Sequence, residues 1–463
     1  MVASEGGKPL IWIKNNHVSL TDHYYEYLQS PAVAAVLCIL IGPLLYSLAQ
    51  QTFRRPRSPV KRKQDLYRLG LSKRSNLDEQ SRPPSETSDA RVKALFTYPI
   101  KSCRGIELAA SEVGATGLKY DRLFTFAQLV SSPDESRQPR SRKQAVNHDW
   151  KHEWRFITQR EFPRLALLRT ELWVPSRKSQ DPMKKRKKSS WAGNGGCVAV
   201  RFPLEPGFNP FGLRTETMTF RVPLMPSSEW ARNRGYSRET MTIWKDQASA
   251  INVTNDIPPD TLEKLKSFLG VSNTLGLFRV DDRNRRAVTR SLPKDRPEES
   301  YSVGFGDAFP LHILSLASVR AIAKDLPDKS KDRGRLDAKR FRANIYLDGV
   351  PAYEEDEWKK VHIGRCIKRI SDQRSFEETD GEYHVACRTA RCTLPNVDQD
   401  SGVRDANEPY TALGKTRKVD KGAYPHPCLG MQMIPLFQQG LLRVGDEVKV
   451  VETGEHSYEK MFG

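Results

Sequence analysis

The stretch "CRTARCTLPNVD" at residues 387–398 contains two cysteines five positions apart, two arginines and a Pro-Asn pair of the kind found in turns. Four interpretations fit these residues: half of a zinc site, part of a disulfide, one reactive thiolate, or cysteines with only a packing role. Arg388 and Arg391 would favour the thiolate form of a neighbouring cysteine, and a loop can present such a group at a cleft. The rest of the chain has to separate these interpretations.

The overall composition narrows the classes of protein. The chain has 463 residues and 38% hydrophobic residues, which is enough for two or three domains with real cores and excludes a wholly disordered protein. The formal net charge is +19, and the runs "RRPRSPVKRK" (54–63) and "KKRKK" (184–188) contain basic but no acidic residues. This balance favours an anionic partner, such as nucleic acid, acidic lipid, a phosphorylated cofactor or an acidic protein.

A single membrane anchor is predicted near the N-terminus. Residues 31–49 read "PAVAAVLCILIGPLLYSLA", and no charged residue lies between Glu26 and Arg54. A helix of this length spans about 28 Å, close to the ~30 Å hydrocarbon core of a bilayer. A buried or interfacial helix is the alternative. The basic run 54–63 predicts a cytosolic location for the part that follows, because positive charge flanks the cytosolic side of membrane spans.

From residue 91 onwards the pattern is globular and predicts an α+β, mainly β fold with two lobes that meet at a cleft. Strands are expected at 91–100, 123–130, 165–174, 196–204 and 216–224, and a strand pair at 441–452. Helices are expected at 260–270, with Asp260 as the N-cap and Gly270 as the stop, and at 315–326, with Ser315 as the cap. A flexible tether is expected at 64–90, and surface loops at 131–152 and 175–195.

The cysteines are seven in number and irregularly spaced, which favours reduced thiols in a cytosolic compartment over a secreted disulfide framework. The candidate zinc ligands are His384, Cys387, Cys392, His426 and Cys428. Their CxxxxC and HxC spacings are not those of common zinc sites. Alternatively, His312 or His426 would serve as the base for a catalytic thiol. In a third interpretation, one thiolate binds a redox-active metal whose other ligands come from a cofactor.

Several separate blocks of the sequence resemble MOSC proteins. "YPIKSCRG" (98–105), followed by "YDRLFTF" (120–126), resembles the start of their N-terminal β-barrel domain, and "ARCTLPNVDQDSG" (390–402) resembles their molybdenum-site signature. The intervening blocks occur in the expected order: "FITQREFPRL" (156–165), "FRANIYLDG" (341–349) and "YEEDEWKKVHIG" (353–364). Together with the predicted anchor, this pattern is similar to the amidoxime-reducing component family of MOSC proteins.

The resemblance implies an N-terminal β-barrel-like domain and a MOSC β-barrel domain, preceded by a single transmembrane helix. The expected divisions are an N-terminal tail (1–30), the anchor (31–50), a basic flexible linker (51–90), the MOSC N-terminal domain (91–255), the MOSC domain (256–455) and a C-terminal tail (456–463).

The resemblance also implies a site. In this family a sulfur-free pterin cofactor places molybdenum under a single protein cysteine, so Cys392 is the implied molybdenum ligand and catalytic residue, with Cys387 only a neighbour. Residues implied to bind the phosphate and pterin of the cofactor are Lys101, Ser102, Arg122, Asp307, Arg342, Asn344 and Arg391. Relatives often have proline at the position of Ala343 and hydroxyl residues at the positions of Ala308 and Phe309. These differences bear on the shape of the substrate.

The implied function is a membrane-anchored molybdenum oxidoreductase that reduces small N-hydroxylated substrates of the amidoxime, hydroxylamine or N-oxide type. No ferredoxin-type cysteine run follows the last block, so a separate electron donor is expected, by resemblance a cytochrome b5-type protein and its reductase. The implied location is the mitochondrial outer membrane or the endoplasmic reticulum, with a cytosolic catalytic domain. Binding of pyridoxal phosphate is a further family-level expectation, and no nucleic-acid partner is expected.

Two other classes remain open from the sequence. One is a non-enzymatic carrier of molybdenum cofactor or sulfur, since other MOSC domains handle sulfur with a cysteine. The other is a membrane-tethered basic module that binds polyanions, for which Cys392 would have no importance.

Overall fold

A computed structural model describes residues 65–72, 74–83, 89–133, 150–176, 189–204, 216–244, 246–369 and 376–459. The predicted anchor and the basic runs 54–63 and 184–188 lie outside these ranges. Among the described residues, no helix has the length and apolar character needed to cross a membrane. The described ranges belong to one compact unit that begins at Asp65.

The described part of the chain is mainly β, as predicted. Its α-helices are α3 (Ser228–Asn233), α4 (Pro259–Leu269), α5 (Leu316–Asp325) and α6 (Tyr410–Thr416). Short 3-10 helices are η2 (Pro163–Leu167), η4 (Ala192–Asn194), η5 (Thr254–Asp256), η6 (Ala338–Phe341), η7 (Glu354–Glu357) and η8 (Leu394–Asn396).

Two sheets are built mainly from the first half of the described chain. One has the strand order β1 (Leu66–Leu69), β8 (Arg169–Pro175), β9 (Cys197–Pro203) and β10 (Thr217–Pro223). The other closes into a barrel of β11 (Ser237–Ile243), β12 (Asp246–Asn252), β13 (Leu275–Val280), β6 (Phe124–Pro133) and β7 (Trp150–Phe156). The closed barrel confirms the predicted barrel-like domain. The boundary predicted at residue 255 falls inside this barrel, because β13 pairs with β6 and β12.

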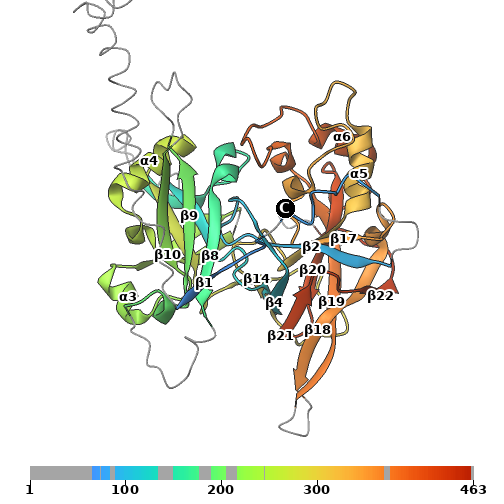
Figure 1. The fold of residues 1–463 in the computed structure, drawn as a ribbon, viewed down its shortest axis with the longest axis horizontal. Helices are drawn as coiled ribbons and strands as arrows, with labels where there is room; N and C mark the ends of the chain where they lie inside the picture. Colours follow the sequence, from blue (N-terminus) through green and yellow to red (C-terminus); the bar gives the residue numbers. More distant parts are fainter. Residues whose placement is uncertain are drawn as a thin grey trace, which may run out of the picture. The chain divides into compact units, whose positions relative to one another are not determined.

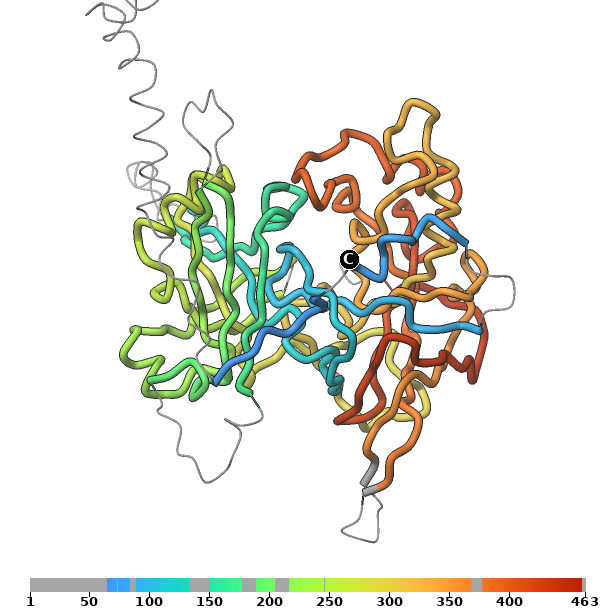
Figure 2. The backbone as a smooth tube through the Cα atoms, viewed as in Figure 1, coloured from blue at the N-terminus to red at the C-terminus, as the bar shows by residue number. Residues whose placement is uncertain are grey.

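The largest sheet joins strands from both ends of the described chain (Figures 1 and 2). Its order is β3 (Ile106–Leu108), β2 (Arg91–Thr97), β17 (Ile345–Asp348), β16 (Leu311–Ser315), β20 (Cys428–Pro435), β19 (Phe376–Ala390), β18 (Trp358–Arg369), β21 (Gln439–Arg443), β4 (Ala110–Gly114) and β5 (Gly117–Leu118), while β22 (Val448–Thr453) pairs with β18. This strand order is open, whereas a second barrel was expected. A separate two-stranded sheet contains β14 (Arg286–Val288) and β15 (Tyr301–Val303).

The pairing of β2 with β17 determines where the later site forms. Leu95 of β2 faces Ile345 of β17 across the sheet, so the segments just after β2 and just before β17 lie together. Strand β4 likewise pairs with β21, with Glu112 facing Leu441. Residues more than two hundred positions apart in the chain are therefore neighbours in space.

Most predicted elements are confirmed, with four corrections. The two strands predicted as a pair at 441–452 are present as β21 and β22, but both pair with β18 and not with each other. Helix α4 begins at Pro259 after Pro258, so Asp260 lies in the first turn and is not the N-cap; proline is favoured at the first helical position because it has no N–H to leave unsatisfied. The strand predicted at 165–174 is preceded by a 3-10 turn and begins only at Arg169. The loop predicted at 131–152 is strand at both of its ends.

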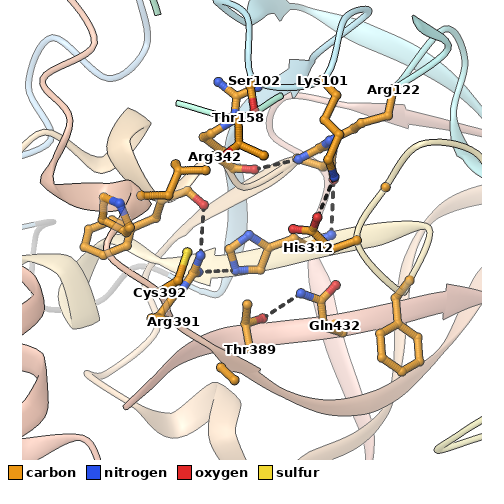
Figure 3. A pocket seen from close by; sticks show the side chains of 18 of the residues that line it. Lys101, Ser102, Arg122, Thr158, His312, Arg342, Thr389, Arg391, Cys392 and Gln432 are labelled. Carbon is orange, nitrogen blue, oxygen red and sulfur yellow. Dashed lines mark hydrogen bonds and ion pairs between the residues drawn. The ribbon is translucent and has the colours of Figure 1, made fainter. Parts of the chain in front are cut away.

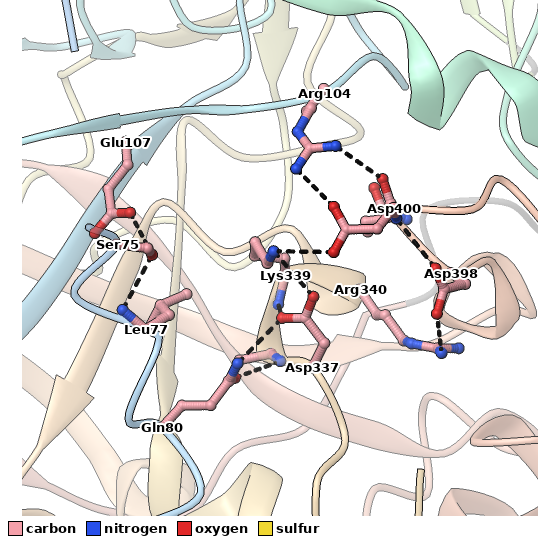
Figure 4. Close-up of polar contacts among 12 residues, drawn as sticks. Ser75, Leu77, Gln80, Arg104, Glu107, Asp337, Lys339, Arg340, Asp398 and Asp400 are labelled. Atoms are coloured by element: carbon pink, nitrogen blue, oxygen red, sulfur yellow. Dashed lines mark hydrogen bonds and ion pairs between the residues drawn. The ribbon is translucent and has the colours of Figure 1, made fainter. Parts of the chain in front are cut away.

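Part of the stretch predicted as a flexible tether is ordered against the domain. Strand β1 lies within it and pairs with β8. Ser75 donates a hydrogen bond of 2.5 Å to Glu107, Gln80 contacts Asp337 at 3.3 Å, and Leu77 is buried (Figure 4). Buried apolar area and these hydrogen bonds stabilise the segment. The polar composition of the segment did not predict that it would be ordered.

Helix α5 is anchored by a buried carboxylate. Ser315, at the end of β16, caps the helix by accepting from the Ala317 N–H at 3.2 Å, as predicted. Glu355 Oε1 accepts hydrogen bonds from the Ser315 N–H at 3.1 Å and the Ser318 hydroxyl at 2.8 Å. Its Oε2 atom is buried and has no hydrogen-bond partner among the described residues. Burial raises the pKa of Glu355 from its usual 4.5 to about 7.

This carboxyl group should make stability depend on pH. The folded protein holds a proton that the unfolded chain releases, so the stabilisation is fully present below about pH 4.5 and is lost as the pH rises through about 7. We expect Glu355→Gln, which cannot ionise, to gain up to roughly 3 kcal/mol relative to the unmodified protein between pH 5 and pH 8. Urea unfolding at the two pH values measures this change. Glu354→Gln, at an exposed neighbouring position, is the control, and equal pH dependence of both variants would contradict the prediction.

Candidate active site

All eight residues implied by the family resemblance line one cavity. They come from distant parts of the chain, and the close-up in Figure 3 shows the labelled side chains directed at a common space. Loops on the barrel side contribute Thr158, Arg160 and Trp244 to the same cavity, and the largest sheet contributes His312 and Gln432. The sequence therefore identified residues that the fold does bring together.

Cys392 lies in the loop that leaves β19. The Arg391 N–H donates to the Pro427 carbonyl at 2.8 Å, and the chain then turns through η8, which confirms the turn predicted at Pro395–Asn396. Asp398 closes the following turn by accepting from Ser401 N–H at 2.8 Å and is held by Arg340 at 2.9 Å. Cys392 is half-buried and faces the cavity.

The other described cysteines are buried, and all six described cysteines are free thiols. Burial raises the pKa of Cys103, Cys197 and Cys428 to about 12, and raises that of Cys387 further. Such thiols stay protonated and unreactive at neutral pH. Burial thus distinguishes Cys392 from its neighbour Cys387, which residue types alone did not.

The zinc and cysteine–histidine interpretations gain no support. Across the described ranges, no group of three or more His, Cys, Asp or Glu side chains is placed to hold a metal ion. His384 contacts the Ser291 carbonyl at 3.0 Å, and His426 contacts the Tyr410 hydroxyl at 3.2 Å. His312 contacts Arg391 at 2.7 Å.

Lys101 and Asp307 form an ion pair at one side of the cavity. Lys101 Nζ donates to the Asp307 carboxylate at 2.5 Å and to the Phe305 carbonyl at 2.9 Å. Lys101 is 7% exposed, and burial lowers its pKa, whereas the Asp307 side chain is 66% exposed. Arg286 donates to the Gly304 carbonyl at 3.2 Å and also to Gly306, which fixes the loop that carries Asp307.

Arg122 and Arg342 stack on the ring of Tyr98. Their guanidinium carbons lie 4.6 Å and 4.3 Å from the ring centroid. Arg122 also donates to Asp121 at 2.5 Å and to Asn344 Oδ1 at 3.0 Å, and Arg342 donates to the Cys103 carbonyl at 2.8 Å. A ring face and backbone carbonyls can stabilise a desolvated guanidinium without neutralising it, so the cavity keeps its positive charge.

Asn344 is the polar centre of this arrangement. Its Oδ1 atom accepts from Arg122 and from the His312 N–H at 3.2 Å, and its Nδ2 atom donates to the Phe96 carbonyl at 3.1 Å. The side chain is 1% exposed. These contacts leave one amide N–H for any ligand, so much of the role of Asn344 is to join β2, β16 and the Arg122 loop.

The backbone around the cavity is conformationally unusual. Seven described residues other than glycine have positive φ, and four of them line the cavity: Ser102 (φ 64°), Arg122 (φ 45°), Trp244 (φ 56°) and Arg342 (φ 54°). Non-glycine residues in this left-handed region cost free energy and persist where the surrounding structure holds them. Their concentration here is typical of a functional site.

Sequence reasoning missed the apolar wall of the cavity. The Trp244 ring lies 5.2 Å from the Phe156 ring in an edge-to-face arrangement, and the Arg160 guanidinium stacks on Trp244 at 4.4 Å. Phe309 also lines the cavity. Phe156 and Arg160 lie in the stretch 156–165, which resembles MOSC proteins. Trp244 follows strand β11, and no local pattern distinguished it from a core tryptophan.

The donor set suits an anionic, phosphate-bearing cofactor. Arg342 Nη2 is buried and has no hydrogen-bond partner among the described residues. An unsatisfied buried donor is costly, and a phosphate or pterin acceptor would satisfy it. Lys101, Ser102, Arg122 and Arg342 supply ammonium, hydroxyl and guanidinium donors for such a group, and Cys392 supplies a thiol on the same cavity. The residues present therefore fit the implied cofactor.

Comparison with known proteins agrees with this arrangement. Residues 300–449 match the MOSC domain, and residues 89–183 match the MOSC N-terminal beta barrel domain. The chain is 32% identical over 363 residues to the human mitochondrial amidoxime-reducing component 1, covering 77% of this chain and 82% of the relative. Rat mitochondrial amidoxime reducing component 2 is 30% identical over 363 residues, with coverage of 77% and 82%.

A more distant relative is the molybdenum cofactor sulfurase of rice, which is 23% identical over 365 residues; the match covers 76% of this chain but only 34% of that protein. The expected binding of pyridoxal phosphate gains no support from any of these matches. From the two domain matches and the identity to relatives along most of their length, we conclude that the chain belongs to the MOSC-domain family that contains the mitochondrial amidoxime-reducing components.

Proposed function

We propose that the chain is a molybdenum-cofactor-dependent oxidoreductase that reduces small N-hydroxylated substrates. The observation that carries this proposal is the meeting of one accessible cysteine, Cys392, with a cluster of buried cations on a single cavity. The names of the relatives, amidoxime-reducing component and molybdenum cofactor sulfurase, support the cofactor and the substrate class.

In this proposal the residues of the cavity divide the work of holding the cofactor. Cys392 holds the molybdenum through its thiolate, the form that binds metals. Lys101, Ser102, Arg122 and Arg342 hold the phosphate and pterin, Arg391 fixes the loop that carries Cys392, and Asn344 fixes Arg122. When bound, the cofactor supplies the two-electron redox chemistry that amino-acid side chains lack.

Asp307 is suited to orient the substrate at the rim of the cavity. Desolvation acts to raise its pKa, but the Lys101 ammonium outweighs this and holds the pKa below its usual range. Asp307 is therefore an ionised acceptor at neutral pH, able to bind the N–H or O–H of an N-hydroxylated group with its remaining oxygen. Trp244, which packs against the Phe156 ring, and Phe309 give one side of the cavity an apolar surface on which the carbon skeleton of a substrate could lie.

Electrons would come from a separate protein, for which a cytochrome b5-type donor and its reductase are our proposal. The net charge of +19 would favour association with an acidic donor through electrostatic complementarity.

A non-enzymatic role as a carrier of molybdenum cofactor is the second candidate, favoured by the similarity to the sulfurase. Turnover of an aryl amidoxime by purified, molybdenum-loaded protein with a chemical reductant separates the two, since a carrier would show none.

The first test concerns the proposed ligand. In protein purified from cells that make the cofactor, Cys392→Ser should abolish turnover, because a hydroxyl ionises far less readily than a thiol and is a poor substitute donor. Cys387→Ser should keep most of the molybdenum and activity, with a lower melting temperature because this position is buried. Turnover and molybdenum content are measured together. An active Cys392 variant beside an inactive Cys387 variant would assign the wrong cysteine.

The second test concerns the anion-binding cations. Arg342→Ala and Arg122→Ala each remove a charge-assisted contact of about 1.5–3 kcal/mol, so cofactor affinity should fall roughly ten- to a hundredfold. Molybdenum content and melting temperature should fall together, because a ligand that binds only the folded state stabilises it. Arg74→Ala, whose side chain is 84% exposed, is the matched control. Full molybdenum content in both cavity variants would place the anion site elsewhere.

The third test concerns location. The relatives are named as mitochondrial, and we propose a single-pass protein of the mitochondrial outer membrane or endoplasmic reticulum with its catalytic domain in the cytosol. Protease added to intact organelles should then digest residues 91–463 and leave a short membrane-bound fragment. Complete protection in the absence of detergent would contradict this orientation.

A further inference from the structure

A buried histidine on β16 touches the centre of the site. His312 is 5% exposed, lines the cavity and points at Arg391 in Figure 3. Two hydrogen bonds join its backbone to Asn344. The His312 N–H donates to Asn344 Oδ1 at 3.2 Å, and the His312 carbonyl accepts from the Asn344 N–H at 2.8 Å. The ring therefore projects from a backbone segment with little freedom to move.

The imidazole is neutral and accepts a hydrogen bond from arginine. Arg391 Nη2 lies 2.7 Å from His312 Nε2. A guanidinium has only donors, so Nε2 must be the unprotonated acceptor and the ring proton is on Nδ1. Burial, together with the charges of Arg391 and Arg122, outweighs the hydrogen bonds of the ring with the backbone of Arg342 and Leu429 and lowers the pKa of His312 well below its usual range, in agreement with a neutral ring.

The neighbouring strand is built to admit this ring. A Cβ atom at Gly430 on β20 would lie 2.6 Å from His312 Nε2 and 2.6 Å from the Ile313 carbonyl oxygen. Gly430 also has φ of 74°, which glycine adopts without strain. The absence of a side chain at position 430 leaves the space in which Nε2 meets Arg391.

Arg391 uses most of its donors to brace the loop that leads to Cys392. Its Nε and Nη2 atoms donate to the Leu429 carbonyl at 2.9 Å and 2.6 Å, and Nη1 donates to the Phe341 carbonyl at 3.1 Å. The contact with His312 satisfies the second N–H of Nη2. Without an acceptor at that point, one N–H of a buried guanidinium is left unpaired, which favours a different orientation of the side chain.

We propose that His312 is a positioning residue: through the hydrogen bond that its Nε2 accepts from Arg391, it fixes the guanidinium and so the backbone from which Cys392 reaches the cavity. In its effect on the cofactor this inference rests on the proposed function, in which Cys392 is the ligand. The contact between His312 and Arg391 itself does not depend on that function.

A pair of amide substitutions tests the role of the acceptor. In His312→Gln, the side-chain oxygen can reach the place of Nε2, whereas in His312→Asn it reaches only the place of Nδ1. The rate at which molybdenum and pterin leave the purified holoprotein should rise about tenfold in His312→Asn and stay within about twofold in His312→Gln, as expected for one charge-assisted contact. His384→Asn, a half-buried histidine outside the cavity, should leave the rate unchanged.

A second measurement does not require the cofactor. In urea unfolding of the cofactor-free full-length chain, His312→Asn should lower the folding equilibrium constant about tenfold, but by much less when Arg391→Met is also present, because the contact has then already been lost. If the unmodified protein carries no molybdenum, the proposed function is wrong. The double-mutant cycle still tests the contact between His312 and Arg391 in that case.

Two outcomes would overturn the role of His312. Additive effects of His312→Asn and Arg391→Met on unfolding would show that the two side chains are not coupled. Equal loss of cofactor from the Gln and Asn variants would show that the shape of the ring, and not its acceptor atom, holds the site together.

Discussion

The concentration of buried positive charge around one cavity is the constraint on which the rest of the site depends. Lys101, Arg342 and Arg391 are each less than 10% exposed, and Arg122 donates to the Arg342 carbonyl at 3.1 Å. Removing such charges from water is expensive. The protein offsets this cost locally, with the ring of Tyr98, with main-chain carbonyls and with Asp121 and Asp307. Most of these partners are uncharged, so a net positive potential remains for an anionic ligand.

The same constraint explains why strands from both ends of the described chain must share a sheet. Lys101 and Ser102 follow β2, Arg342 and Asn344 precede β17, and β2 pairs with β17. The main-chain hydrogen bonds between β2 and β17 hold the positively charged side chains of Lys101 and Arg342 near each other. Together these hydrogen bonds oppose the repulsion between the two charges. The left-handed backbone conformation of Ser102, Arg122 and Arg342 costs further free energy, which the pairing of these strands offsets.

The sequence predicts the features that have a local pattern, and it does not predict those that depend on pairing between distant strands. Helices α4 and α5 have local periodicity, and both were predicted with small errors at their ends. Of the 22 strands in the described part of the chain, seven overlap the stretches predicted as strands, and β16 to β20 of the largest sheet are among those that were not predicted. Cys392 and the seven residues implied to bind the cofactor were identified by resemblance; residue types alone left a packing role equally open. Neither route identified Tyr98 as the ring beneath two arginines, or His312 as the acceptor for Arg391, because both roles are created by pairing between strands distant in sequence. The ordered segment around Leu77 escaped prediction for a similar reason, since its polar composition resembles that of a linker.

The loop that carries Cys392 is held from both sides of the cavity. On the barrel side, Gln399 donates to Gln159 Oε1 at 2.9 Å, and Gln159 donates to the Ser102 carbonyl at 2.6 Å, so one buried amide pair joins this loop to the turn that carries Lys101 and Ser102. On the other side, Arg340 binds Asp398 at 2.9 Å, and Arg104 binds Asp400 at 2.6 Å (Figure 4). Both carboxylates follow the cysteine by only a few residues. The position of the thiol is therefore determined jointly by the barrel-side loops and the largest sheet, which makes the two parts of the fold inseparable in their effect on the site.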